Sequence, residues 1–313
     1  MSQSVTLVFC GTPRFAVPTL EALVRAGFPV GLVVTQPDKP RGRGLALAPS
    51  AVKEAALSLQ LPVTQPGSIK SNDEFRAQIT ALKPDAIIVV GYGRIIPQWM
   101  IDLPRFGNIN LHASLLPKYR GAAPIQWAVA RGETATGVTI MRIDAGLDTG
   151  DILLQTEVPI KVTDTAETLA PVLAATGADL MVDTLHGLQA DTITPRPQDH
   201  ANATLAPILK KQAGWIDFHR TAQEICNRLR GFQPWPGAFT IFRGKNLHVW
   251  QAAVSQHSLP PGELWVESNC LFAGCGKGTA LALFEVQPEG KKRMPAGDFV
   301  HGYRPQSGEK LGS

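Results

Sequence analysis

The sequence predicts an α/β domain built from parallel βαβ units, followed by a small β-barrel or β-sandwich. The chain has 313 residues, of which 44% are hydrophobic and 18% charged, which is enough for two domains with sizeable cores. Short apolar runs alternate with helical patterns along its first third. Short strand-like runs separated by glycine and proline fill its last third. This composition excludes intrinsic disorder.

Strands and helices alternate in the N-terminal part, and most of them end at glycine or proline. Four apolar runs bounded by turn residues are predicted as buried strands: residues 5–9, 30–35, 86–90 and 108–111. Three segments with helical spacing of apolar residues are predicted as helices: residues 16–26, 50–59 and 72–82. Because parallel strands need crossover connections, this order predicts helices on both faces of one sheet.

A different pattern begins near residue 132. Residues 137–143 and 152–158 are strand-like and flank a glycine-rich loop, and residues 165–189 have the pattern of one long amphipathic helix. A helix at 221–229 and five short strands come later: residues 238–242, 247–254, 263–267, 270–272 and 280–286. Between them, a polar stretch punctuated by prolines predicts a linker. The expected organisation is a first domain, a linker and a second domain, at residues 1–190, 191–207 and 208–313.

Metal sites, disulfides and membrane segments are not predicted. The four cysteines lack the paired spacing of a zinc site, so they are interpreted as reduced thiols of a cytoplasmic protein: Cys10, Cys226, Cys270 and Cys275. The N-terminus runs directly into a strand without a basic segment, unlike a signal peptide. We expect no apolar run long enough to span a bilayer. No long exposed apolar stripe is visible, so a monomer is expected.

Basic residues concentrate in the C-terminal domain. The whole chain has 30 Lys and Arg against 26 Asp and Glu, and this net charge of +4 does not by itself indicate a nucleic-acid binder. Residues 207–313 hold 13 basic and 8 acidic residues, a net of +5, and the excess includes Lys210 and Lys211. Small β-barrels with a basic face often bind nucleic acids, although +5 is also an ordinary solubilising charge.

Two loops follow the first two predicted strands. Gly11-Thr12-Pro13 is either a backbone anion site or a simple tight turn, and it matches neither the dinucleotide fingerprint nor a P-loop. Residues 36–44 carry Lys39, Arg41 and Arg43 beside glycines. That loop suits an element that contacts phosphates, and equally a solvated surface loop.

Asn110 and His112 stand two residues apart at the end of a predicted strand, so their side chains should share one face. A carboxamide and an imidazole can together hold an oxyanion and move a proton, although an isolated Asn-x-His is also an ordinary polar strand end. Residues 144–151 place three aspartates in a glycine-rich loop that lacks the closing glutamate of a calcium loop. One of these carboxylates can orient the imidazole, and the alternative is a hairpin loop with capping carboxylates.

Taken together and in this order, the motifs resemble those of the methionyl-tRNA formyltransferase family. The resemblance covers nearly the whole chain, with matching segments at residues 8–13, 36–53, 110–117, 120–125, 137–141, 146–151 and 231–238. It implies a doubly wound, Rossmann-like catalytic domain and an OB-like C-terminal domain that binds tRNA. The implied reaction moves a formyl group from 10-formyltetrahydrofolate to the α-amino group of methionine on initiator tRNA. No metal is implied.

The resemblance also implies roles for individual residues. The expected catalytic residues are Asn110, His112 and Asp148. The expected folate-side loop consists of Ser114, Leu115, Leu116 and Pro117. The expected tRNA contacts are Lys39, Arg41, Arg43, Lys210 and Lys211. Minor departures from the family pattern occur at Cys10 and Ala113, and neither residue should carry chemistry.

Several alternatives remain at this stage. A glycinamide ribonucleotide formyltransferase would be similar over the first domain only, so residues 207–313 count against it. Folate-dependent enzymes that formylate a sugar nucleotide or another small amine, and formyl-folate hydrolases, share a C-terminal barrel. The Pro-Arg-Gly-Arg-Gly sequence at 40–44 favours tRNA over these. A non-catalytic RNA-binding protein would not need the intact catalytic trio, and a dehydrogenase would need the missing dinucleotide fingerprint.

Overall fold

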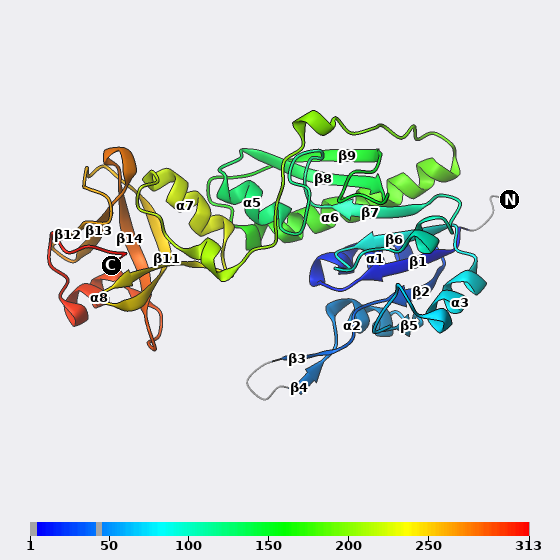
Figure 1. The fold of residues 1–313 in the computed structure, drawn as a ribbon, viewed down its shortest axis with the longest axis horizontal. Coiled ribbons are helices and arrows are strands. Elements are labelled where there is room, and N and C mark those ends of the chain that lie inside the picture. Colours follow the sequence, from blue (N-terminus) through cyan, green and yellow to red (C-terminus); the bar gives the residue numbers. More distant parts are fainter. Residues whose placement is uncertain (1–4, 42–45, 313) are drawn as a thin grey trace. The chain divides into compact units, whose positions relative to one another are not determined.

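The computed structural model describes residues 5–41 and 46–312, and the chain folds into two compact units (Figure 1). The first unit comprises residues 1–122, 135–159 and 170–206, and the second comprises residues 123–134, 160–169 and 207–313. The polar stretch expected as a linker thus lies almost entirely within the first unit. Its backbone pairs with that unit, since Arg196 bridges to Ile152 and Leu205 bridges to Arg120.

A seven-stranded sheet forms the first unit. The strands lie side by side in the order β5 (Val63–Thr64), β2 (Val30–Val34), β1 (Leu7–Gly11), β6 (Ala86–Val90), β7 (Asn108–His112), β8 (Ala135–Arg142) and β9 (Ile152–Pro159). Neighbouring strands from β5 to β7 are parallel, and β8 and β9 are antiparallel to their neighbours. The predicted α/β fold is confirmed, and the strand order reverses between β1 and β6, where such sheets bind ligands.

Side-chain alternation decides what each face of this sheet contacts. On one face, Val8 and Ile87 share a core with α3 (Asp73–Leu82) and α4 (Gln98–Ile101). On the other face, Leu111 of β7 packs against Gly177 of α6 (Ala166–Gln189), where an added Cβ would come within 2.5 Å of the leucine. The remaining helices of this unit are α1 (Val17–Arg25) and α2 (Ala51–Ser58). Ser50 caps α2, because its hydroxyl accepts a hydrogen bond from the backbone N–H of Lys53.

Helix α6 bears on the expectation that no segment spans a membrane. It has 24 residues, and within residues 5–41 and 46–312 it is the single helix long and apolar enough by composition to cross a membrane. Its apolar content has a different explanation, because Leu173, Met181 and Leu185 are fully buried inside the fold. A core helix of an α/β unit meets the same length and composition test as a membrane span.

A six-stranded antiparallel sheet forms most of the second unit. Its strands are β10 (Ala238–Phe242), β11 (Lys245–Ser255), β14 (Ala280–Pro288), β13 (Cys270–Gly274) and β12 (Leu264–Glu267), with β15 (Met294–Pro295) pairing to β14. Two helices contribute to its core, α7 (Ala222–Gly231) and α8 (Ala296–Tyr303). Thr221 and Glu224 form a capping box that fixes the start of α7. The predicted small C-terminal β domain is confirmed, and all of its strand pairs are antiparallel.

Helix α5 (Pro124–Ala130) belongs to this second unit although it lies between strands of the first. Gly231 of α7 allows the close approach, since a Cβ there would lie 2.6 Å from the backbone N of Ala130. Trp127 and Phe232 meet edge to face across the two helices, with ring centroids 5.3 Å apart. The sequence did not predict α5, α4 or α8. Helices of 7 and 4 residues are too short to display a clear period, and α8 contains Gly297 and Gly302, which weaken a helical pattern.

Candidate active site

His112 is the last residue of β7 and is 6% exposed, so its imidazole has few possible partners. Its Nε2 lies 2.9 Å from the backbone carbonyl oxygen of Tyr119. A carbonyl oxygen can only accept a hydrogen bond, so Nε2 must carry the proton. In the neutral ring, Nδ1 therefore holds a lone pair and can take up a proton.

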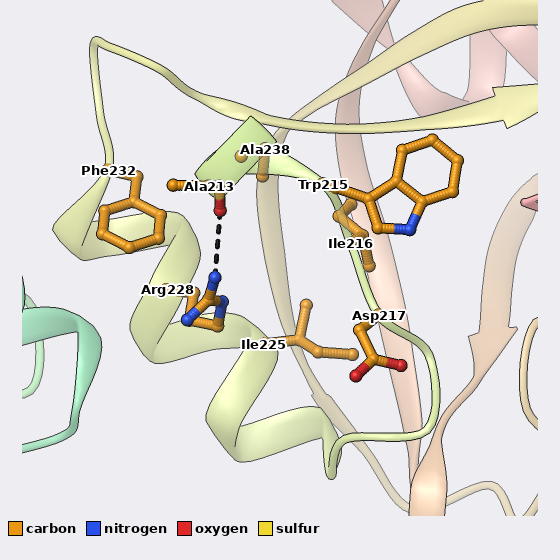
Figure 2. Close-up of a pocket in the computed structure, with 9 residues that line it drawn as sticks. Ala213, Trp215, Ile216, Asp217, Ile225, Arg228, Phe232 and Ala238 are labelled. Carbon is orange, nitrogen blue, oxygen red and sulfur yellow. Dashed lines mark hydrogen bonds between the residues drawn. The ribbon is translucent and has the colours of Figure 1, made fainter. Parts of the chain in front are cut away.

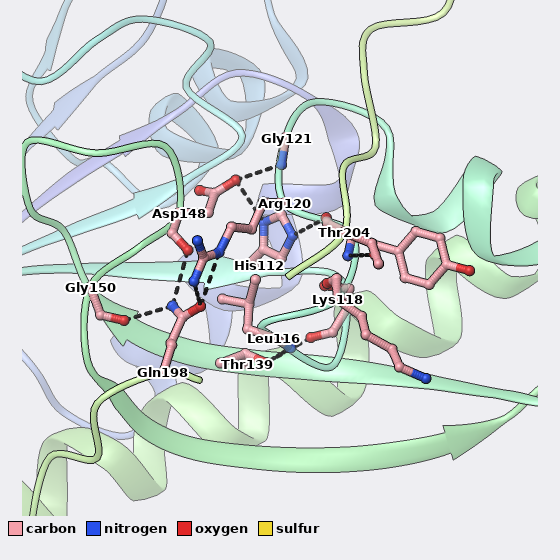
Figure 3. Close-up of polar contacts among 12 residues, drawn as sticks. His112, Leu116, Lys118, Arg120, Gly121, Thr139, Asp148, Gly150, Gln198 and Thr204 are labelled. Carbon is pink, nitrogen blue, oxygen red and sulfur yellow. Dashed lines mark hydrogen bonds and ion pairs between the residues drawn. The ribbon is translucent and has the colours of Figure 1, made fainter. Parts of the chain in front are cut away.

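The Nδ1 atom of His112 faces Asp148, whose Oδ2 lies 3.6 Å away (Figure 3). That separation is an ion-pair distance and is too long for a hydrogen bond. The carbonyl of Tyr119 therefore orients the imidazole, and Asp148 supplies negative charge beside the nitrogen that can become protonated.

Asp148 occupies a left-handed backbone conformation with φ of 52°. Its Oδ2 accepts a hydrogen bond of 2.8 Å from the backbone N–H of Gly121, which itself has φ of 119°. A non-glycine residue with positive φ persists when its surroundings hold it there, and such positions cluster at functional sites. The backbone N–H of Gly121, in the segment that follows His112 in the sequence, thus holds the carboxylate of Asp148 in place.

Gln198 holds the loop that carries Asp148. Its Nε2 donates to the backbone oxygens of Asp148, at 3.0 Å, and Gly150, at 2.7 Å (Figure 3). Its Oε1 accepts from Nε and Nη2 of Arg120, and both side chains are buried. One amide thereby connects the Asp148 loop, the segment after His112 and the stretch expected as a linker. Sequence analysis missed this role, because a single glutamine in a polar, proline-rich segment has no recognisable pattern.

The turn of residues 114–117 is fixed to β8 and β9. Ser114 is fully buried, and its hydroxyl donates to the carbonyl oxygen of Lys118 at 2.6 Å. Thr139 on β8 donates to the carbonyl of Ser114 and accepts from the N–H of Leu116. Leu116 is buried with Met141 and Ile152, while Leu115 and Pro117 are partly exposed. Four residues were expected beside a folate. Leu115 and Pro117 offer accessible surface, whereas Leu116 is buried and the hydroxyl of Ser114 stabilises the turn.

Asn110 lies on β7 two residues before His112, opposite Met141 of β8, and is partly exposed. Strand alternation places its side chain on the same face as that of His112. The structure thus brings His112 and Asp148 together, and it puts Asn110 on the adjacent position of the same strand face.

The chain's similarity to known proteins agrees with this geometry. Residues 4–185 match the family model described as formyl transferase, and residues 208–304 match its C-terminal domain. Over 306 residues, covering 98% of each chain, the protein is 68% identical to the methionyl-tRNA formyltransferase of Koribacter versatilis. This chain belongs to the methionyl-tRNA formyltransferase family.

Further similarities fit membership of the methionyl-tRNA formyltransferase family. The enzyme of that name from Acidobacterium capsulatum is 62% identical over 298 residues, covering 95% of this chain and 96% of that one. A solved sugar 3N-formyl transferase, obtained in the presence of dTDP and 5-N-formyl-THF, matches with a TM-score of 0.66 and 18% identity. The match covers 93% of this chain and 100% of the sugar formyl transferase chain. At 18% identity it shows a shared fold alone.

The basic residues expected to contact tRNA lie in both units. Lys39 and Arg41 belong to β3 (Lys39–Arg41), which pairs with β4 (Ala46–Ala48) as a hairpin, and Arg43 falls outside the described residues. Lys39 is exposed and donates to Gln36 at 2.9 Å. Lys210 and Lys211 are exposed at the start of the second unit, where Lys211 opens the short 3-10 helix η3 (Lys211–Gly214).

Asp38 anchors the base of the β3–β4 hairpin. Its carboxylate accepts hydrogen bonds of 2.7 Å from Nζ of Lys53 and 2.7 Å from Nε2 of Gln65. These bonds, that of Lys53 first, hold the pKa of Asp38 below its usual value. Gln36 in turn donates to the carbonyl of Tyr92 at 2.8 Å, which ties the hairpin to the loop after β6.

The Gly11-Thr12-Pro13 turn packs tightly against that same loop after β6. A Cβ at Gly91 would lie 2.8 Å from the ring of Pro13, and a Cβ at Gly11 would lie 2.8 Å from the ring of Phe9. The hydroxyl of Thr12 also donates to the carbonyl of Tyr92, at 3.3 Å. Both glycines are therefore required by close packing at the strand-order reversal.

Among residues 5–41 and 46–312, no group of three or more His, Cys, Asp or Glu side chains is placed to hold a metal ion. Burial raises the pKa of the Cys10 thiol well above its usual range, and raises that of Cys226 to about 11 and that of Cys275 to about 12. These three thiols stay protonated at neutral pH and are poor nucleophiles.

Proposed function

We propose that this chain transfers the formyl group of 10-formyltetrahydrofolate to the α-amino group of methionine attached to initiator tRNA. The observation that carries the proposal is the pairing of His112 with Asp148 beside Asn110, in a chain 68% identical to a methionyl-tRNA formyltransferase. We assign the chemistry to residues 1–190 and tRNA binding mainly to residues 208–313, joined by residues 191–207.

His112 acts as the base that receives the proton of the attacking amine. Its Nδ1 is the unprotonated nitrogen, because the carbonyl of Tyr119 holds the proton on Nε2. As the amine nitrogen bonds to the formyl carbon, Nδ1 takes the proton and Asp148, 3.6 Å away, stabilises the imidazolium. The same proton then passes to the folate nitrogen when its bond to the formyl carbon breaks. Protons and bonds balance, with formylmethionine and tetrahydrofolate as products.

Asn110 stabilises the tetrahedral intermediate. Attack on the formyl carbon leaves a negative oxygen, and the carboxamide N–H of Asn110 donates a hydrogen bond to it. A fixed donor of this kind typically contributes about 2.7–4 kcal/mol to lowering the barrier. The partly exposed Leu115 and Pro117 supply apolar surface beside the strand end for the flat pterin of the co-substrate. The residues present thus fit a folate, which supplies the activated formyl group.

Positive charge in both units supports a polyanionic acceptor. Lys39 and Arg41 on the hairpin lie in the first unit, and Lys210 and Lys211 lie in the second; Arg43 adds a further positive charge to the sequence between β3 and β4. Each phosphate neutralised by such a residue releases counterions, so binding of the tRNA should weaken as salt rises. A small amine acceptor would show no such dependence.

The test is formylation by the purified full chain, followed as formylmethionine released from the tRNA by mild base. Methionyl initiator tRNA should be formylated, with consumption of 10-formyltetrahydrofolate only when the charged tRNA is present. Methionyl elongator tRNA and an amino sugar nucleotide are the comparison acceptors. Formylation of the sugar nucleotide but not of the tRNA would overturn the proposal in favour of the sugar-nucleotide alternative, which the shared fold of the sugar formyl transferase also allows.

We also propose that the enzyme acts in the cytoplasm as a monomer. Its four cysteines are free in the structure, as suits a reducing compartment. Light scattering coupled to size-exclusion chromatography should give a mass near the 33.6 kDa of one chain. A mass twice that value would contradict the monomer.

A further inference from the structure

Four aromatic side chains form a continuous row on the second unit. Trp215 meets Phe239 with ring centroids 5.8 Å apart, and Phe239 meets His248 at 5.6 Å. His248 stacks on Trp250 at 6.3 Å, with an interplanar angle of 24°. We call Trp215, Phe239, His248 and Trp250 the aromatic row. None of these residues takes part in the chemistry proposed for the first unit.

Strand alternation puts the aromatic row on the outer face of the sheet. Phe239 lies between the buried Ala238 and Thr240 on β10, and His248 lies between the buried Leu247 and Val249 on β11. Phe239 and His248 are direct cross-strand neighbours, since they pair in the β10–β11 register. The core of the unit is built from the opposite face, so these rings are not needed to fill it.

Both tryptophans are held in place and remain accessible. Trp215 is 39% exposed, and Figure 2 shows it projecting to the side of the pocket away from Phe232. Its backbone is fixed because it follows η3 and its neighbour Ile216 donates to the carbonyl of Phe239 at 2.9 Å. Nε1 of Trp250 donates to Oε1 of Gln287 at 2.9 Å, which sets the plane of the indole. A fixed aromatic surface loses little entropy on binding.

Basic side chains lie near His248 and Trp250. Burial and, to a smaller extent, the charge of Lys211 lower the pKa of His248. The guanidinium of Arg293 lies 5.0 Å from the ring of Trp250 and also pairs with Glu285. Gln287, which holds Trp250, donates to the carbonyl of Lys291 and so fixes the exposed Lys291–Arg293 segment beside the row.

Aromatic rings flanked by cations suit one class of ligand best. Nucleobases stack on aromatic side chains while basic residues follow the phosphates, which is how sheet surfaces bind single-stranded nucleic acid. Protein–protein interfaces are by contrast depleted in lysine, whereas Lys211 and Lys291 lie beside the aromatic row. We propose that the aromatic row stacks unpaired bases of the RNA substrate, with Lys211 and Arg293 contacting adjacent phosphates. This inference rests on the proposed function for the identity of the RNA.

The test measures binding of the full chain to a fluorescently labelled single-stranded RNA of eight nucleotides and to methionyl initiator tRNA. The variants are Trp215→Ala and Trp250→Ala, with Trp215→Phe and Trp250→Phe keeping a ring. Trp265→Ala is the matched control, because Trp265 is 41% exposed on β12 of the same unit and lies outside the row. Each alanine variant should weaken binding of the single strand about tenfold, and the phenylalanine variants should recover most of it. Thermal unfolding verifies that every variant folds.

The outcomes separate this inference from the proposed function. If wild-type protein formylates the tRNA but the row variants bind the single strand as the Trp265→Ala control does, the aromatic row is not a base-stacking site. If duplex RNA competes as well as the single strand, binding is electrostatic and the inference is likewise overturned. Failure of wild-type protein to formylate tRNA would instead count against the proposed function. Loss of single-strand binding in the alanine variants with full recovery by phenylalanine supports stacking.

Discussion

The edge of the first unit that carries His112 and the outer face of the second unit bind their proposed partners by opposite means. Around His112, one hydrogen bond to the carbonyl of Tyr119 orients the imidazole, and hydrogen bonds from Gly121 and Gln198 hold Asp148 beside it. On the second unit, exposed lysines and partly exposed rings present a broad surface to solvent. We therefore expect that changing one side chain near His112 can remove most of the turnover. A single substitution on the second unit should weaken RNA binding by a much smaller factor.

The largest expected effect comes from Asp148→Asn. Asparagine keeps an oxygen that can accept from the N–H of Gly121, so the loop stays in place, but the negative charge beside Nδ1 of His112 is lost. Because Asp148 stabilises the imidazolium formed in proton transfer, turnover should fall about 10²- to 10⁴-fold, the usual contribution of acid–base catalysis. Single-turnover formylation and tRNA binding are the two measurements. Unchanged turnover would remove Asp148 from the mechanism and weaken the contrast between the two regions.

Asn110→Ala should have the second largest effect. It removes the donor assigned to the oxyanion while leaving the His112–Tyr119 hydrogen bond intact. The turnover number should fall about 10²- to 10³-fold, or about 2.7–4 kcal/mol of barrier. The Michaelis constants for both substrates should change little. A rise in a Michaelis constant with full turnover would assign Asn110 to binding instead.

Variants of Gln198 test whether the connecting amide positions the site or only stabilises the fold. Gln198→Leu removes the acceptor of the buried Arg120 and the donor to the Asp148 loop, so the free energy of unfolding should fall by about 1–3 kcal/mol. Its turnover should fall about tenfold to a hundredfold, because small displacements of reacting groups are costly.

Gln198→Glu is the matched control for that experiment. It keeps an acceptor for Arg120, now charged, but sets a carboxylate oxygen against the carbonyls of Asp148 and Gly150 in place of the N–H groups. The ion pair with Arg120 offsets part of this repulsion, so the free energy of unfolding should fall less than in Gln198→Leu, while turnover still falls. Wild-type turnover in this variant would show that Gln198 acts through stability alone.

Asp38→Asn tests the anchor of the basic hairpin. The neutral side chain weakens the hydrogen bond from Lys53, so the Michaelis constant for tRNA should rise a few-fold with turnover unchanged. The pKa of Asp38 is lowered in the folded protein, so its carboxylate is ionised and bonded to Lys53 at any pH above the ordinary aspartate pKa. The stabilisation is lost only when the pH falls through the lowered pKa. Wild-type tRNA affinity should thus show no transition from this group between pH 5 and 8. A transition there that disappears in the variant would contradict the assignment.

Lys210→Ala and Lys211→Ala should give the smallest effects. Each removes one exposed cation, so tRNA affinity should fall a few-fold, and the slope of log K against log salt should shrink by about one. A salt series of equilibrium binding measurements checks both values. A loss of a hundredfold from either lysine would mean that the second unit relies on single contacts, as the active site does.

The sequence determined the local features of this protein. Apolar runs such as residues 86–90 predicted the parallel core, because the period of apolar residues is encoded within a few residues. The Asn110–His112 spacing predicted a shared face, and the asymmetric charge predicted a basic C-terminal domain. Short elements such as α5 were missed, since seven residues carry too little periodic signal.

Only the tertiary structure decided how the imidazole of His112 is held. The sequence offered Asp148 as its orienting partner, whereas the carbonyl of Tyr119 makes the hydrogen bond and Asp148 stands at 3.6 Å. Likewise, Gln198 lies 50 residues from Asp148 in the chain, yet it donates to that residue's backbone. Sequence patterns report periods and neighbours along the chain, whereas a backbone carbonyl or a lone amide becomes a specific partner only when the fold brings distant segments within hydrogen-bond distance.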